Sequence, residues 1–162
     1  MPKSAYILIC LVLVTSLPVL LAACSEDDDC SASARGMMEC SIFTVNPQTG
    51  LAEAGIIDLV TVTALETDSV IINRKAEAQS LSLPLRYGKE ETSLVLHYLN
   101  QGKEDTITVL HTNTPYFLTL DCGFQMKQDI TSVKHTAHLI DSITISHPDA
   151  NNYGKENLKI YY

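Results

Sequence analysis

The sequence contains no tryptophan, and its seven tyrosines and three phenylalanines are few for 162 residues. Proteins that bind carbohydrate commonly stack the sugar on Trp or Tyr, so this composition gives little support to a sugar-binding platform. Basic residues are also scarce, since eleven Lys and Arg stand against nineteen Asp and Glu, for a net charge of −8. Such an acidic surface disfavours nucleic acid and anionic lipid head groups, and we expect no nucleic-acid partner.

Catalytic sequence motifs are absent. The chain holds no Gly-x-Ser-x-Gly, P-loop, His-Glu-x-x-His or Cys-x-x-Cys pattern. The best metal candidates are the five histidines, of which two are three residues apart and would share one face of a helix: His97, His111, His135, His138 and His147. A zinc site needs three or four ligands, and no further partner is evident. We therefore interpret these histidines as exposed loop residues and expect no metal or cofactor.

Acidic neighbours could in principle supply a pair of catalytic carboxylates. The candidates are Asp121 beside Cys122, Glu90 with Glu91, and Glu104 with Asp105. All are predicted at strand ends and turns, where solvated charges are usual, so we predict no catalytic residue. The polar residues 111–115 interrupt two predicted strands and are a plausible binding loop.

The N-terminus has the pattern of a secretory signal. Lys3 precedes an apolar run over residues 6–21, and Leu-Ala-Ala leads directly to Cys24. A membrane-spanning helix is the competing interpretation, but Pro18 interrupts the run and acidic residues follow it. Leu-Ala-Ala-Cys resembles the bacterial lipobox, which implies that residues 1–23 are removed and that Cys24 carries lipid. Two or three acyl chains there would hold the protein on a membrane.

Four consecutive carboxylates, Glu26 to Asp29, cannot be buried and predict an extended tether over residues 24–36. An acidic cluster after the lipidated cysteine also resembles the signal by which Bacteroidota export lipoproteins to the outer face of the outer membrane. The resemblance implies a lipid-anchored outer-membrane protein at the cell surface. Without that export the domain would face the periplasm.

Three cysteines remain in the mature chain: Cys30, Cys40 and Cys122. In an oxidising compartment they can form one disulfide. Cys40 lies in an alternating run and is expected in the core, whereas Cys30 and Cys122 lie where a bond could tie the tether to the domain. We predict a Cys30–Cys122 disulfide, with Cys40 in place of Cys30 as the alternative.

Residues 37–162 show period-two alternation nearly throughout, which predicts an all-β domain. About eight strands without a long amphipathic helix favour an antiparallel β-sandwich of immunoglobulin-like character, with an up-and-down barrel as the alternative. Residues 75–78 and 125–134 could each form a helical turn. Pro84 cannot donate to a sheet ladder and predicts an edge strand. The expected strands cover residues 37–45, 57–65, 69–73, 79–85, 93–99, 105–112, 115–121, 139–146 and 157–162.

Several segments, among them Leu81-Ser82-Leu83-Pro84-Leu85, Asp121-Cys122-Gly123 and the C-terminal Asn157-Leu158-Lys159-Ile160-Tyr161-Tyr162, resemble an uncharacterised family of small Bacteroidota lipoproteins. The resemblance implies no activity, and it supports the Cys30–Cys122 pairing. We therefore expect a non-catalytic binding or interaction module that is anchored to the membrane through Cys24 and recognises a protein or glycan. The alternative is a small envelope hydrolase or metal-dependent enzyme with an unrecognised site.

Overall fold

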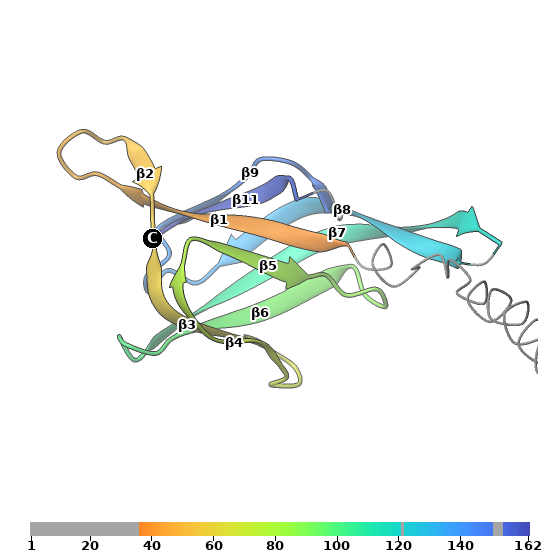
Figure 1. Cartoon of the computed structure of the whole chain (residues 1–162), viewed down its shortest axis with the longest axis horizontal. Coiled ribbons are helices and arrows are strands. Elements are labelled where there is room, and N and C mark those ends of the chain that lie inside the picture. The colour runs from red at the N-terminus through yellow and green to blue at the C-terminus, as the bar shows by residue number, and fades with distance from the viewer. Residues whose placement is uncertain (1–35, 121, 151–153) are drawn as a thin grey trace, which may run out of the picture. The chain divides into compact units, whose positions relative to one another are not determined.

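The computed structural model describes residues 36–120, 122–150 and 154–162, which form eleven strands and no helix (Figure 1). The predicted signal, residues 1–23, and residues 24–35 of the predicted tether lie outside the described residues. Within the described part of the chain, no helix is long and apolar enough to cross a membrane. The strands are β1 (Met37–Val45), β2 (Ala52–Ala54), β3 (Ile57–Ala64), β4 (Val70–Ala78), β5 (Ser80–Pro84), β6 (Glu91–Tyr98), β7 (Lys103–Thr119), β8 (Gly123–His135), β9 (Ser142–Ile145), β10 (Asp149–Ala150) and β11 (Glu156–Tyr161).

The strands form two packed sheets. One sheet has the order β2-β1-β11-β9, with β5 also paired to β1, and the other has the order β10-β8-β7-β6-β3-β4. The predicted antiparallel β-sandwich is confirmed, with eleven strands rather than about eight. One pair is parallel, since β1 and β11 run in the same direction. The position of Pro84 is also confirmed, because within residues 36–120, 122–150 and 154–162 strand β5 pairs only with β1, and Pro84 is its last residue.

The core lies between the two sheets and follows the alternation of the sequence. Inward residues on β1 and β11 face those on β3, β6 and β7, and each strand turns its other face toward solvent. This alternation was predictable because a strand in a sandwich has one buried face. The central core residues include Met38, Cys40, Ile42, Val60, Val62, Leu81, Leu83, Leu94, Leu96, Tyr98, Ile107, Val109, Leu158 and Ile160.

Both predicted helical turns are wrong, because residues 75–78 lie in β4 and residues 125–134 lie in β8. In β4, Arg74 and Glu77 have positive φ angles of 49° and 47°. The register against β3 shifts near the first of them, as in a β-bulge, which breaks the alternation. In β8 the inward position before Ile130 is the buried Gln128, and Gln125 is also buried although it lies on the other face, so the apolar alternation disappears although the strand continues.

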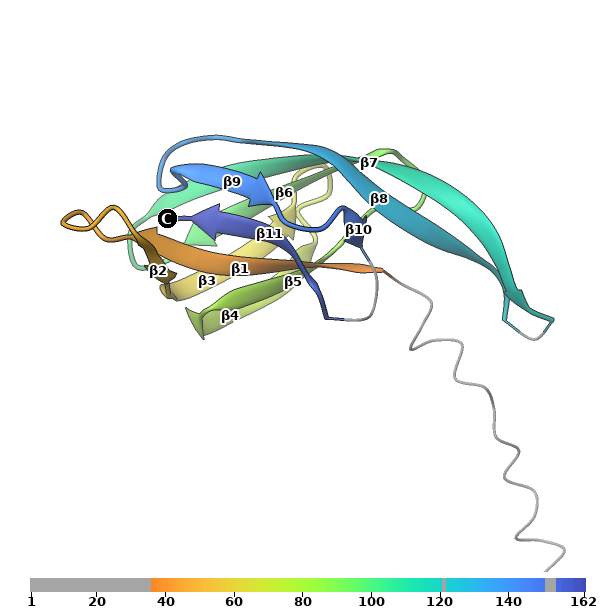
Figure 2. The ribbon, with the colours of Figure 1, turned by 90° about the horizontal axis from the view of Figure 1, so that it is seen from above.

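The predicted loop at residues 111–115 is also wrong, because this segment lies inside the 17-residue strand β7. Strands β7 and β8 pair from Ile107–His135 to Thr119–Gly123 as one long hairpin. Its far part projects beyond the other strands of the sandwich (Figure 1 and Figure 2). The same strands therefore cover the core at one end and form an exposed projection at the other.

Candidate functional site

A buried polar cluster under β7 holds the loop between β5 and β6. The Asn113 side-chain amide donates hydrogen bonds to the backbone carbonyls of Arg86, Tyr87 and Lys89 at 3.1, 3.0 and 2.8 Å. Gln128, fully buried on β8, donates to Asn113 Oδ1 at 2.8 Å and to the Arg86 carbonyl at 3.1 Å. Side chains of two strands thus replace the sheet partners that the loop backbone lacks.

His111 extends this cluster. Its ring is only 2% exposed and hydrogen-bonds Thr92 Oγ1 at 2.9 Å and Asn113 Oδ1 at 3.1 Å. Burial lowers the pKa of His111 below its usual value, partly offset by Asn113 and the charge of Glu90. The expectation of an exposed loop histidine is wrong here, because His111 is a buried residue of strand β7.

The loop borders a cleft of about 510 Å³. Glu66, from the β3–β4 turn, lies 2.8 Å from Arg86 and 2.9 Å from Lys89 across this cleft. Hydrogen bonds from Arg86 and then Lys89 lower the pKa of the Glu66 carboxyl. All three side chains are about half exposed, so their charges can reach a ligand. The remaining lining is largely apolar and includes Ile71, Pro84, Leu85, Tyr87 and Leu94.

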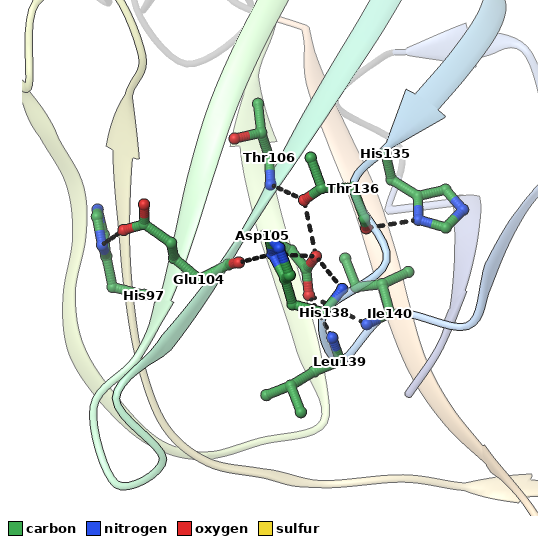
Figure 3. Close-up of polar contacts among 9 residues, drawn as sticks. All are labelled: His97, Glu104, Asp105, Thr106, His135, Thr136, His138, Leu139 and Ile140. Carbon is green, nitrogen blue, oxygen red and sulfur yellow. Dashed lines mark hydrogen bonds and ion pairs between the residues drawn. The ribbon is translucent and has the colours of Figure 1, made fainter.

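Asp105 forms a second polar centre at the start of β7 (Figure 3). Its carboxylate is fully buried and accepts hydrogen bonds from Thr136 Oγ1 and from the backbone N–H groups of His138, Leu139 and Ile140 at 2.7, 2.8, 2.8 and 3.1 Å. Burial alone would raise the pKa of Asp105, but these donors lower it overall. The expectation of a solvated charge is wrong for Asp105, which anchors the segment after β8.

The comparisons with known proteins identify the family of this domain. Residues 59–162 match a family of unknown function, DUF6452. The chain belongs to this family. The expectation of an uncharacterised domain is thereby confirmed, and the DUF6452 region includes both the cleft and the Asp105 centre. No curated protein and no solved structure matches the chain.

The other histidines of the DUF6452 region have separate partners. His97 contacts Glu104 Oε2 at 3.1 Å, His138 donates to the Glu104 carbonyl at 2.7 Å, and His135 donates to the Thr136 carbonyl at 2.8 Å. Among the residues that the structure describes, no three His, Cys, Asp or Glu side chains could hold one metal ion. His147 is exposed between β9 and β10.

The carboxylate candidates do not form one site. Glu90 and Glu91 are exposed at the start of β6, and Asp121 lies outside the described residues. Sequence reasoning did not single out Glu66, Arg86 or Lys89. Their contacts join segments about twenty residues apart and follow no motif, so no local spacing could have revealed them.

Cys40 is fully buried in β1 and its thiol is free. Burial and the adjacent Glu39 carboxylate raise the pKa of this thiol, which keeps it protonated and unreactive. The core position predicted for Cys40 is confirmed, and the alternative Cys40–Cys122 pairing is wrong. Cys24 and Cys30 lie outside the described residues, so lipidation at Cys24 and the Cys30–Cys122 disulfide stay predictions.

Proposed function

We propose that this protein is a non-catalytic binding module, held on a membrane by lipid, that recognises an acidic segment of a protein partner in the cleft beside loop 86–89. The observation that carries the proposal is that the side-chain amide of Asn113 hydrogen-bonds to three carbonyls of the loop backbone. A loop held in this way loses little conformational entropy on binding, which is what a preformed site requires. The cleft also falls in the size range of ligand pockets, about 300–1,000 Å³.

The chemistry of the cleft favours a ligand that is both acidic and apolar. Arg86 and Lys89 supply two cations against the single carboxylate of Glu66, so the group has a net positive charge. A carboxylate of the partner can form an ion pair with Lys89 while the ion pair between Arg86 and Glu66 is retained. Ile71, Pro84 and Leu85 give an apolar wall for the neighbouring side chain. The scarcity of aromatic residues favours a peptide over a sugar.

We further propose a lipid on Cys24 and a place on the outer face of the outer membrane of a member of the Bacteroidota. Support comes from the apolar run, the Leu-Ala-Ala-Cys sequence and the acidic residues 26–29. The test is proteinase K treatment of intact cells that carry either the wild type or a variant with residues 26–29 changed to Ala. Digestion of the wild type alone supports surface export. Protection of both until the outer membrane is opened overturns surface exposure and favours a domain that faces the periplasm.

The binding proposal is tested by NMR titration of the protein with an acetylated peptide of alternating Leu and Glu. We expect the amide signals of residues 86–89 to shift, and Lys89→Met to weaken binding at least fivefold. Lys134→Met, which removes an exposed charge on β8, is the matched control and should leave the affinity unchanged.

A Leu–Gln peptide of the same length should shift these signals much less. Equal shifts by both peptides, or equal weakening by both Lys variants, would overturn recognition of the carboxylate. Shifts produced only by oligogalacturonate would replace the protein partner with an acidic glycan.

A further inference from the structure

The tip of the β7–β8 hairpin exposes a cluster of large apolar side chains. Phe117, Leu120 and Phe124 are 53%, 92% and 76% exposed, and Tyr116, the residue before Phe117, is 42% exposed. We call these four residues the hairpin tip. Exposing so much apolar surface to water is unfavourable, and such clusters usually mark a contact surface. A strand end selected only for solubility would carry charged residues instead.

The hairpin tip is held in a defined conformation. Phe117 and Phe124 face each other across the two strands, with ring centroids 5.6 Å apart in a T-shaped arrangement. The Tyr116 hydroxyl donates to Gln125 Oε1 at 3.2 Å, and strand pairing continues as far as Thr119 and Gly123. The exposed rings are therefore presented by a paired backbone.

The hairpin projects from the end of the domain at which Gly36, the first described residue, lies. A side chain at Gly36 would meet the Ala150 carbonyl oxygen at 2.5 Å and Gln128 Oε1 at 3.7 Å, so the first described residue lies against β10 and β8. Gln128 pairs with Asn113 across the hairpin, and the six residues after Asn113 on β7 extend about 20 Å further. The opposite end of the domain carries the β1–β2 connection (Figure 1 and Figure 2).

This geometry places the tip within reach of the proposed anchor. Cys24 lies twelve residues before Gly36, a length of chain that spans at most about 43 Å. A lipid at Cys24 would hold this end of the domain near a bilayer, and the tip projects about half that distance. A nearby anchor makes insertion of the tip intramolecular, so even a weak apolar contact would be occupied.

We propose that the hairpin tip inserts into the interfacial layer of a zwitterionic phospholipid bilayer and sets the orientation of the domain on the membrane. The proposal rests on the lipid anchor of the proposed function. The net charge of −8 argues against an anionic surface, so apolar burial drives the insertion, which should be insensitive to salt. Phe, Tyr and Leu are suited to this layer, where aromatic rings lie at the depth of the head groups.

The absence of tryptophan allows a single-reporter test on the full, lipidated protein reconstituted in phosphatidylcholine vesicles. We would place the reporter at the tip with Phe124→Trp and, as the matched control, at the other end with Leu51→Trp, since Leu51 is also exposed, at 65%. Lipids brominated along the acyl chain should quench the tip reporter at least threefold more than the control. In the Phe124→Trp background, Phe117→Ser with Leu120→Ser should abolish this difference.

Co-sedimentation of the protein with the vesicles tests attachment through the lipid anchor independently of insertion of the tip. Co-sedimentation with equal quenching of both reporters would overturn insertion of the tip and leave the anchor standing. Failure to co-sediment would overturn both. A blue-shifted but unquenched tip reporter in a protein of dimeric mass would show that the tip packs against a second copy, which also overturns the proposal.

Discussion

Asp105→Asn is the most informative single change in this domain, because it removes charge while keeping the size of the side chain. The carboxylate now accepts four hydrogen bonds, two at each oxygen. The Asn amide keeps one acceptor oxygen. In place of the second carboxylate oxygen it has an NH₂ group, which points at the donors that bonded to that oxygen. With the oxygen toward Leu139 and Ile140, the amide nitrogen faces Thr136 Oγ1 and the N–H of His138.

The expected loss follows from these contacts. A hydrogen bond to a charged group contributes about 1.5–3 kcal/mol, so the loss of the His138 bond, together with the loss of charge at the other three, predicts a decrease of about 3 kcal/mol in the free energy of unfolding. For a domain of this size, a decrease of about 3 kcal/mol lowers the melting temperature by about 10 °C. Asp58→Asn, on the exposed face of β3, is the control and should change stability by less than about 0.5 kcal/mol.

Urea unfolding at neutral pH measures the difference, and hydrogen exchange locates it. We expect the amides of residues 138–140 to exchange faster in Asp105→Asn than in the wild type. A decrease below about 1 kcal/mol, or unchanged exchange at these three amides, would refute the role of Asp105 as the anchor of this segment.

The same variant predicts a pH dependence. The folded-state pKa of Asp105 is lowered, so its contribution is present above the unfolded pKa of about 3.9 and is lost as pH falls through the lower folded value. The stability difference between the wild type and Asp105→Asn should therefore be constant near neutral pH and shrink below about pH 4. A difference that persists unchanged into that acid range would contradict the assignment.

Two further predictions concern His111 and the thiols. Burial lowers the folded pKa of His111, so the unfolded state binds the proton more tightly, and stability should rise with pH from that lowered pKa up to about 6.5. His111→Gln should remove this slope in urea unfolding, whereas the exposed His147→Gln should retain it. With Cys30 paired to Cys122, alkylation of the mature lipidated protein should modify no thiol in the native state and one, that of Cys40, after denaturation without reductant. Three modified thiols would show that the disulfide is absent.

The parts of the fold that the sequence predicted are those in which burial alternates strictly. The bounds of β1 agree with the prediction at both ends, and its inward residues Met38, Cys40 and Ile42 are buried. Alternation failed in β4, where Arg74 and Glu77 have positive φ and the register against β3 shifts beside Arg74. A bulge is stabilised by the strand opposite, so the residues that form it need carry no local signal.

The polar centres were predicted less well, because a buried carboxylate and a solvated one look the same in a sequence. Asp105 occupies the inward position of β7 before Ile107, but the donors that satisfy its carboxylate there lie 31 to 35 residues further along the chain. Asn113 and His111 occupy inward positions of β7 and were interpreted as a break in the strand. In each case the hydrogen-bonding partners that allow the polar side chain to be buried are distant in the sequence and are brought close by the tertiary fold.

The hairpin tip shows why a correct pattern can still mislead. Phe117 continues the inward alternation of Ile107, Val109 and His111 along β7, yet its side chain is 53% exposed. Period-two alternation records which face of a strand is apolar, and it carries no information on where the opposing sheet ends. Strand β7 extends beyond the opposing sheet of the sandwich. Its last apolar side chains therefore have no second sheet to pack against. We infer that the apolar residues beyond the opposing sheet serve a contact outside the domain. Alternation in the sequence therefore assigns to the core the residues that form a contact surface.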